Sequence, residues 1–560
     1  MAKIIYGGDT ETVNGKPNSL QFYSEDIACN DIIFCDEKTA LKKFLAWCDK
    51  RPMKTQNVVY IHNLEFDLVE LFYGIHDKLA SGEFDFTVGG WHVTGCYGAP
   101  TFAKLTSKNR SVLLIDSFSF YRGSLASAAD LFCPDLPKLK RPKNLGAIRY
   151  TAKDENFCAY AMRDAEIGYF IGKQIERLHT EFDLQQCVSV ADLAARIFRH
   201  AFLTYTIPQP GRDVIECALQ SYHGGKNNIA APRGWYPNVT ALDISSAYPA
   251  AMEIMPAFSD DKLYKRITIK NPRSVPPYGV YYVSGTVAEC KWPVFFSHSF
   301  KPLSGAVDRV AIHGHEINEA LRSGEAKISS VRGWYYDAEK DHQAPALRGF
   351  VRDFYRRKET EKDKVMRFMY KLILNSISGK FIQTRKTARV QYTDLDLGVS
   401  FSASELIAGG MFHPFIASSI TAHTRARIHK LEHQYKALHT ATDGIFTQSK
   451  RLPNETKKLG ALAVEGQGDL LMLRNKLYVL YGKGGAIESR AFKGKRIIKY
   501  ALHGFQGRIH DLEALIATGR RKYTVEKPNR LKQSVKLGRQ VNLFESREMI
   551  LKIGDLPLRK

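Results

Sequence analysis

The stretch Ile4-Ile5-Tyr6-Gly7-Gly8-Asp9-Thr10-Glu11 ends an apolar N-terminal segment on two carboxylates. Its β-rich composition predicts a strand, and residues two apart on a strand leave the same face. Asp9 and Glu11 can therefore share one divalent ion, which prefers hard oxygen ligands. An Asp-x-Glu pair by itself is common and is typical of a solvated strand end, so its meaning depends on the rest of the chain.

Two more acidic positions follow at a distance. Asp67 closes the segment His62-Asn63-Leu64-Glu65-Phe66-Asp67, and Asp164 comes four residues after Tyr160. On a helix, Tyr160 and Asp164 lie on one face, where the hydroxyl could orient an attacking water. Four carboxylates from three separated segments suit two neighbouring ions, so the set predicts a metal-dependent nuclease.

A second acidic set lies far downstream. Asp243 lies in Leu242-Asp243-Ile244, five residues before Tyr248, and Asp443 lies in Thr442-Asp443-Gly444 between apolar residues. A carboxylate, a free backbone carbonyl and an aromatic ring can bind metal and triphosphate and close off a sugar. The simpler interpretations are an Asp that caps a helix before a turn, and a hairpin turn.

A basic helical face is predicted between these two positions. Lys371, Asn375 and Ser378 follow the spacing i, i+4 and i+7, with Arg367 one turn earlier. This face could hold a triphosphate and a base. A solvated basic stripe is the alternative.

The length, charge and cysteine content of the chain indicate the kind of protein that carries both acidic sets. The 560 residues are too many for one core and predict three or more subdomains. Lys and Arg number 81 against 58 Asp and Glu, and the net charge of +23 is typical of a surface that follows a polyanion. The nine cysteines form no CxxC pair, which predicts reduced, buried thiols in a cytosolic protein. No apolar run reaches transmembrane length, so we expect no membrane contact and a cytoplasmic location.

The order of elements can be predicted coarsely. Residues 1–180 alternate β-rich runs with helical patterns, which predicts an α/β unit with acidic residues at strand ends. Residues 348–376 predict two basic helices broken near 359–363. A β-rich insert is expected at 383–415, followed by a helix at 421–438 and a hairpin.

Together these segments resemble the motifs of family B DNA polymerases, in the protein-primed branch found in Bacillus-type phages. The early acidic segments are similar to that family's exonuclease motifs, and those at Asp243, Lys371 and Asp443 to its polymerase motifs A, B and C. Three shorter signatures are similar to Tyr-x-Gly-Gly, Thr-x-x-Gly-Arg and Lys-x-Tyr of the branch: Tyr222-His223-Gly224-Gly225, Thr421-Ala422-His423-Thr424-Arg425 (with Thr424 in the Gly place) and Lys476-Leu477-Tyr478. The resemblance spans essentially the whole chain.

The resemblance implies an α/β and α+β multidomain fold. An RNase H-like 3′→5′ exonuclease domain would precede a right-hand polymerase of palm, fingers and thumb with two palm insertions. The implied domains are the exonuclease at 1–183, the palm at 184–253 and 416–512, terminal-protein region 1 at 254–347, the fingers at 348–382, terminal-protein region 2 at 383–415 and the thumb at 513–560.

The resemblance also implies roles in catalysis. Two ions in the exonuclease site would be bound by Asp9, Glu11, Asp67 and Asp164, with Tyr160 assisting, and two ions in the polymerase site by Asp243, the Ile244 carbonyl and Asp443. An exonuclease lysine is expected among Lys138, Lys140 and Lys143. The nucleotide would be bound by Tyr248, which excludes ribose, and by Arg367, Lys371, Asn375 and Ser378.

DNA contacts are implied in the same way. Phe66 would stack on the frayed primer end, as aromatic side chains do in single-strand sites. Asp116-Ser117-Phe118 is similar to the branch's Ser-Leu single-strand motif, with Phe in place of Leu. The implied DNA-binding residues are Thr12, His62, Asn63, Phe66, Ser117, Phe118, Tyr222, Gly224, Gly225, Thr421, Arg425, Lys476 and Tyr478.

Two positions depart from the family pattern. Motif C usually reads Asp-Thr-Asp, and here Ala441 stands in the first place. We expect two-metal catalysis to survive on Asp243 and Asp443, with altered metal preference and tolerance of Mn²⁺. Motif B usually carries Tyr where Ser378 stands, and the loss of this ring predicts looser nucleotide selection.

The predicted function is a DNA-directed DNA polymerase that replicates a viral or mobile-element genome. We expect protein priming, 3′→5′ proofreading, strand displacement and two Mg²⁺ per active site. The expected partners are primer–template DNA, single-stranded DNA, dNTPs and a terminal priming protein, and the chain is expected to be a monomer. The alternatives are a primer-independent family B polymerase, suggested by Thr442-Asp443-Gly444, a metal-dependent exonuclease with a degenerate polymerase half, and a non-catalytic DNA-binding partner.

Overall fold

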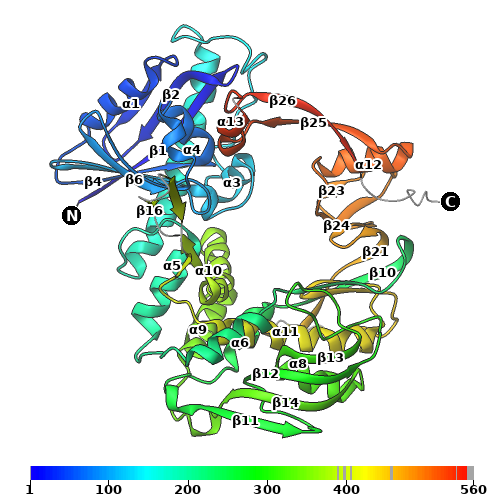
Figure 1. The fold of residues 1–560 in the computed structure, drawn as a ribbon. Helices are drawn as coiled ribbons and strands as arrows, with labels where there is room; N and C mark the ends of the chain where they lie inside the picture. The colour runs from blue at the N-terminus through cyan, green and yellow to red at the C-terminus, as the bar shows by residue number, and fades with distance from the viewer. Residues whose placement is uncertain are drawn as a thin grey trace. The chain divides into compact units, whose positions relative to one another are not determined.

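The chain folds into two compact units in the computed structural model, which describes residues 2–386, 390–394, 399–403, 406–453, 458–537 and 539–551 (Figure 1). Unit 1 comprises Met1–Ile197, Glu361–Met369 and Glu526–Arg547, and unit 2 comprises Phe198–Thr360, Tyr370–Val525 and Glu548–Lys560. The domain boundaries predicted from the sequence stay predictions. Two segments group unexpectedly with the N-terminal part of the chain in unit 1, namely Glu361–Met369 and Glu526–Arg547.

Unit 1 is built on an eight-stranded sheet in the order β3-β2-β1-β4-β8-β7-β6-β5. The strands are β1 (Lys3–Val13), β2 (Lys16–Ser24), β3 (Cys29–Phe34), β4 (Gln56–Ile61), β5 (Glu83–Val88), β6 (Trp91–Cys96), β7 (Phe102–Ser107) and β8 (Arg110–Asp116). β1, β4 and β8 pair in parallel, and the other neighbours are antiparallel. The carboxyl ends of the parallel strands meet at one edge, so Asp9, His62 and Asp116 come to the same side, where such sheets bind ligands.

The long helix of unit 1 lies against this sheet at very short range (Figure 1). The helices are α1 (Ala40–Asp49), α2 (Leu64–Leu71), α3 (Leu125–Phe132), α4 (Glu155–Glu181) and α5 (Val190–Ile197). A Cβ on Gly7 of β1 would lie 1.8 Å from the Ala165 carbonyl oxygen of α4. Glycine at this position is therefore what lets the two backbones touch. The contact carries Asp164, the residue before Ala165, to the strand that holds Asp9.

Unit 2 contains a second eight-stranded sheet, in the order β23-β24-β22-β21-β10-β20-β19-β9. Its strands are β9 (Lys226–Ile229), β10 (Gly234–Ile244), β19 (His439–Thr442), β20 (Gly444–Thr447), β21 (Leu462–Arg474), β22 (Leu477–Gly482), β23 (Ile487–Glu488) and β24 (Arg496–Leu502). A separate four-stranded sheet has the order β11-β14-β12-β13. In the sequence, its strands come after β10 and before the helices predicted at 348–376. Its strands are β11 (Tyr264–Lys270), β12 (Gly279–Val287), β13 (Gly305–His313) and β14 (Ala326–Tyr336).

The helices of unit 2 include α9 (Ala346–Thr360) and α10 (Lys364–Ser376), which confirm the pair predicted at 348–376. The first part of α10 belongs to unit 1. The other helices of unit 2 are α6 (Arg212–Ser221), α7 (Ala247–Glu253), α8 (Gly314–Ser323), α11 (Pro414–Tyr435) and α12 (Ile509–Thr518). The helix predicted at 421–438 begins earlier than expected, at Pro414. Proline is suited to the first helical turn, where its missing N–H is not needed, and the His413 side chain caps the helix. The predicted face of Lys371, Asn375 and Ser378 is also shorter, because α10 ends at Ser376 and Ser378 begins a 3₁₀ turn.

Three two-stranded ribbons complete the described chain. They are β15 (Thr384–Lys386) with β18 (Leu406–Ala408), β16 (Val390–Asp394) with β17 (Val399–Ala403), and β25 (Lys522–Pro528) with β26 (Phe544–Ile550), the last enclosing α13 (Leu531–Leu537). The first two confirm β-structure in the insert predicted at 383–415, of which 387–389, 395–398 and 404–405 lie outside the described residues.

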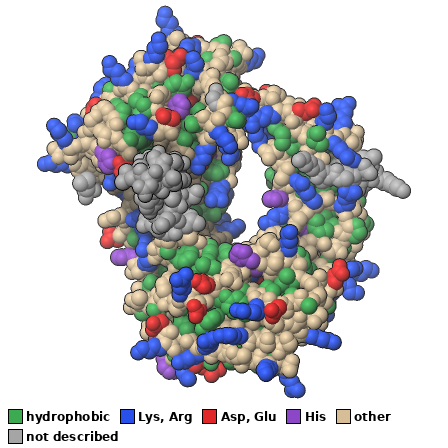
Figure 2. Space-filling model, viewed as in Figure 1, with side chains coloured by type: hydrophobic (Ala, Val, Ile, Leu, Met, Phe, Trp, Pro, Cys, Tyr) green, Lys and Arg blue, Asp and Glu red, His purple; other side chains and the backbone are tan. Residues whose placement is uncertain are grey.

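The surface and the cysteines also bear on the sequence predictions. Lys and Arg side chains are scattered over the visible face rather than gathered at one end (Figure 2). All nine cysteines are free, but the prediction that they are buried is wrong for Cys290, which is exposed, and for Cys96 and Cys158, which are half-buried. Among the described residues, no helix is long and apolar enough to cross a membrane.

Buried ion pairs join α11 to its surroundings in unit 2. Arg425 is fully buried and donates from Nε and Nη2 to the two carboxylate oxygens of Glu316, at 2.8 and 3.0 Å. Lys226 and Glu432 form a second pair in which both side chains are inaccessible. Buried charges are tolerated only when paired, so these contacts fix where β9, α8 and α11 meet.

Arg425→Met should lower the free energy of unfolding by about 3–5 kcal/mol, because it leaves Glu316 buried without its partner. Urea unfolding followed by tryptophan fluorescence measures the loss. The double variant Arg425→Met/Glu316→Leu should be more stable than Arg425→Met, since no unpaired charge remains. Equal stability of wild type and Arg425→Met would contradict the assignment.

Candidate active sites

Unit 1 brings three of the predicted carboxylates into one cluster. Asp9, Glu11 and Asp164 offer ligand oxygens that all lie within 4.8 Å of one another. Asp9 and Glu11 point from the same face of β1, and α4 supplies Asp164. Hard oxygen ligands at this spacing fit Mg²⁺ or Mn²⁺. The donor set is therefore chemically suited to a divalent metal centre.

Burial and mutual repulsion keep these carboxylates from ionising easily. Burial raises the pKa of Glu11 to about 8, and the charge of Asp164 adds to the effect. Burial, followed by the charges of Asp67 and Asp164, raises the pKa of Asp9 well above its usual value. Carboxylates that repel one another in this way are stabilised by a cation, and Asp164 has one buried oxygen without a hydrogen-bond partner in the described chain.

Lys138 is the one of the three candidate lysines that reaches the cluster. Its ammonium group pairs with Asp164 Oδ2 and lies 5.1 Å from the centre of the Tyr160 ring. Lys140 and Lys143 are exposed. The sequence left all three open because they lie in a segment without regular structure, and only the fold selects Lys138.

Asp67 lies beside the cluster rather than within it. It is buried, and its Oδ1 accepts a 2.7 Å hydrogen bond from Thr10 Oγ1. Burial raises the pKa of Asp67 to about 7, while the Thr10 bond opposes the shift. Its predicted role as a fourth ligand stays a prediction.

The predicted single-strand residues gather at the same edge of the sheet. Asp116 Oδ1 accepts hydrogen bonds from the backbone amides of Asn63 and Phe118, both at 2.9 Å, and so ties two loops together. His62 contacts Ser117 Oγ at 3.0 Å and the Gly123 carbonyl at 2.9 Å, so both ring nitrogens are engaged within the protein. Asn63 and Phe118 are exposed, whereas Thr12 and Phe66 are half-buried.

Unit 2 pairs the two downstream carboxylates across a hairpin. Asp243 of β10 lies opposite Gly444 of β20, and the Ile244 amide donates to the Asp443 carbonyl at 3.0 Å. Thr442 has a φ of +64°, and the tight turn there presents Asp443. Burial and then the charge of Asp443 raise the pKa of Asp243 to about 7. This pair too would be stabilised by a bound cation.

Glu465 and Lys499, which the sequence motifs did not indicate, border this pair. Lys499 pairs with Glu465, and its Nζ lies 4.0 Å from Asp243 Oδ1. The Glu465 charge helps to raise the pKa values of Asp243 and Asp443. β21 and β24 supply these residues, so only sheet pairing could have found them.

The Tyr-x-Gly-Gly segment lies against motif C. A Cβ on Gly225 would lie 2.3 Å from Thr442 Cγ2 and 3.0 Å from the Tyr248 hydroxyl, so a larger residue would displace one of them. Arg425 Nη1 donates to the carbonyls of His223 and Gly224. The guanidinium therefore fixes the position of this loop. Because Arg425 is fully buried, its side chain is not accessible for direct contact with DNA.

The predicted nucleotide-binding face is exposed on α10. Arg367, Lys371 and Asn375 are exposed, and Ser378 is half-buried. The Lys371 charge lowers the pKa of Asp243 and so offsets part of the shift caused by burial.

The remaining predicted DNA contacts are largely internal. Thr421 is buried and donates to backbone carbonyls of its own helix. Tyr478 is 3% exposed and its ring packs edge-on against Phe446 at 4.7 Å. Tyr222 and Lys476 are half-buried. The DNA-binding roles of all four stay predictions.

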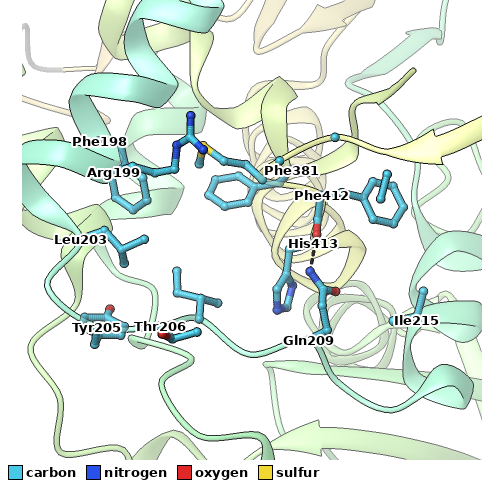
Figure 3. Close-up of a pocket in the computed structure, with 15 residues that line it drawn as sticks. Phe198, Arg199, Leu203, Tyr205, Thr206, Gln209, Ile215, Phe381, Phe412 and His413 are labelled. Atoms are coloured by element: carbon cyan, nitrogen blue, oxygen red, sulfur yellow. Dashed lines mark hydrogen bonds between the residues drawn. The ribbon is translucent and has the colours of Figure 1, made fainter. Parts of the chain in front are cut away.

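A separate cavity of about 540 Å³ lies where the 198–209 connector meets the start of α11 (Figure 3). Its wall includes Phe198, Phe381 and Phe412. Gln209 donates to the Phe412 carbonyl, and the His413 ring contacts the Pro208 carbonyl at 3.2 Å. None of the predicted site residues lines it, so it is distinct from both carboxylate sites.

Comparisons with known proteins agree with the motifs. Residues 147–413 match the family model for DNA polymerase type B, organellar and viral. No curated protein matches the sequence. The predicted resemblance to family B DNA polymerases is confirmed by this family match.

The fold is shared with solved structures of one polymerase. Phi29 DNA polymerase complexed with primer-template DNA matches with a TM-score of 0.70 at 16% identity, over 98% of this chain and 100% of that chain. Its ternary complex with primer-template DNA and incoming nucleotide substrates also gives 0.70 at 16%, and its complex with single-stranded DNA gives 0.69 at 16%, with the same coverage. At this identity the match shows a shared multidomain fold, and the two palm insertions stay predictions.

Metal binding at the unit 1 cluster should depend steeply on pH. Glu11 has a pKa of about 8 without metal, so it must lose a proton before it can bind an ion. Mn²⁺ affinity, measured by electron paramagnetic resonance in an Asp243→Asn background, should rise between about pH 6 and pH 8. The rise should vanish in Asp9→Asn/Glu11→Gln. A flat profile without these substitutions would be inconsistent with the cluster.

Proposed function

From the match of residues 147–413 to the family model for DNA polymerase type B, organellar and viral, we propose that this chain is a DNA-directed DNA polymerase with a separate 3′→5′ exonuclease site. The observation that carries the proposal is the presence of one carboxylate site in each compact unit, each with its own lysine. In both, the carboxylates would hold divalent ions that lower the pKa of the attacking hydroxyl or water and neutralise the leaving group.

In the polymerase site, protein side chains would bind and orient the nucleotide. Lys371 and Asn375 project from an exposed helical face, where they can meet a triphosphate and a base. The Tyr248 hydroxyl lies close to Gly225 of the 222–225 loop, and the ring would there meet a ribose 2′-hydroxyl. Lys499 would balance the charge of Asp243 when no ion is present.

In the exonuclease site, Lys138 would stabilise negative charge that develops on the scissile phosphate. Tyr160 would orient the attacking water from the same side. Phe66 and Phe118 would stack on bases, and Asn63 would bind the strand. His62, with both nitrogens engaged, would act by holding Ser117 and Phe118 in place.

The two departures from the family pattern fit this function with changed properties. Asp243 and Asp443 keep a two-carboxylate site despite Ala441, and Glu465 adds negative charge beside it. Mn²⁺ would then support synthesis at least as well as Mg²⁺. Ser378 would leave more space under the new base pair than Tyr, which favours misinsertion.

Primer extension with 3′-end degradation in the same assay tests the two sites. Asp443→Ala should lower extension by about a thousandfold or more, because one carboxylate ligand is lost. Asp9→Ala/Glu11→Ala should lose degradation and keep extension. Lys138→Met should lower degradation by about 10- to 100-fold, whereas the matched variant Lys140→Met should not. If the wild-type protein degrades DNA but does not extend a primer with either metal, the alternative of a metal-dependent exonuclease is favoured. If it synthesises DNA from template and dNTPs without a primer, the primer-independent polymerase is favoured.

The two predicted insertions would give the polymerase protein priming and strand displacement. Residues 254–347 would dock a terminal protein, and residues 383–415 would help to encircle DNA. Deletion of 383–415 should shorten products on a primed circular template and abolish displacement of a downstream strand, while gap filling remains. Unchanged product length and displacement would rule out this role. Monomeric action and a cytoplasmic location are part of the same proposal.

A further inference from the structure

A short C-terminal loop packs against the predicted exonuclease site. We call residues 539–543 the docking loop; it precedes β26 and belongs to unit 1. Val541 of this loop and Leu531 of α13 are part of the hydrophobic core of the N-terminal sheet. Most of unit 2 lies between that sheet and the loop in the sequence, so no local pattern could have indicated the contact.

The docking loop touches two elements that carry site residues. Gln540 Nε2 donates to the Asn14 carbonyl at 2.5 Å, in the turn that follows Glu11 and Thr12. A Cβ on Gly15 would lie 2.8 Å from the Leu543 amide nitrogen, so the turn and the loop are in direct backbone contact. On its other side the loop reaches α2, which carries Phe66 and Asp67.

Asn542 makes the contact with α2. Its Nδ2 donates to Glu70 Oε1 at 2.6 Å and to the Phe66 carbonyl at 3.1 Å. Asn542 is 5% exposed and Glu70 is inaccessible, so these bonds are shielded from water. Asn542 has a φ of +58°, a backbone conformation that asparagine accepts more readily than most residues.

We propose that the docking loop positions the single-stranded 3′ end for exonuclease cleavage, with Asn542 as the positioning residue. The loop ties the β1–β2 turn to α2, and these two elements hold Thr12 and Phe66, which would bind the frayed end. Asn542 acts through the backbone of Phe66 and does not touch the reacting atoms. This inference rests on the proposed function of unit 1.

Asn542→Asp tests the inference, because it keeps the backbone preference and removes both donated bonds. The probe is a single-stranded oligonucleotide with 2-aminopurine at its 3′ end. KM for its degradation in Mg²⁺ should rise about fivefold to tenfold, with kcat within about twofold of wild type. The half-saturation concentration of the fluorescence change in EDTA should rise by the same factor. Primer extension should not change.

Two variants separate positioning from stability. Glu70→Gln still offers an oxygen to Asn542 and should retain the wild-type KM. Glu548→Gln on β26, which breaks the exposed pair with Lys522 of β25, is the matched surface control. A lower melting temperature of Asn542→Asp with unchanged KM and unchanged half-saturation would overturn the proposal. If wild type does not degrade the oligonucleotide, the proposed function of unit 1 fails, while the fluorescence comparison still decides whether the loop positions the 3′ end.

Discussion

The architecture of unit 2 depends on the buried contact between Arg425 and Glu316. The guanidinium donates hydrogen bonds to the Glu316 carboxylate of α8 and to two backbone carbonyls of the 222–225 loop. Its side chain is fully buried. Because an unpaired buried charge is so costly, the helix, the four-stranded sheet and the loop must meet in one arrangement. Gly225 then lies against Thr442 and the Tyr248 hydroxyl, so the ion pair also bears on where the 222–225 loop meets the turn before Asp443.

Both carboxylate sites follow the same electrostatic rule. Each places acidic side chains so close and so buried that their pKa values rise, and each places one lysine beside them: Lys138 in unit 1 and Lys499 in unit 2. Such a site holds protons or a lysine until a divalent cation competes for its oxygens. Metal binding would therefore be coupled to proton release in both units, although different strands and helices supply the carboxylates.

Close backbone approach is the second constraint on the sites. α4 can bring Asp164 to β1 only because Gly7 has no side chain, and the β1–β2 turn can receive the docking loop only because Gly15 has none. These glycines lie a few residues from Asp9 and Glu11. The N-terminal strand is thus shaped as much for what packs on it as for the ions it would bind.

Local spacing alone was enough to indicate the paired Asp9 and Glu11, the face shared by Tyr160 and Asp164, and the helices on either side of the 359–363 break. Those features depend on strand and helix periods, which a sequence displays directly. Tertiary structure alone selected Lys138 among three lysines, added Glu465 and Lys499 to the second site, buried Arg425 away from solvent, and brought Asn542 to Phe66. In each of these cases the partners come from segments that are distant in sequence, and their proximity follows from sheet pairing and burial, for which no local pattern exists.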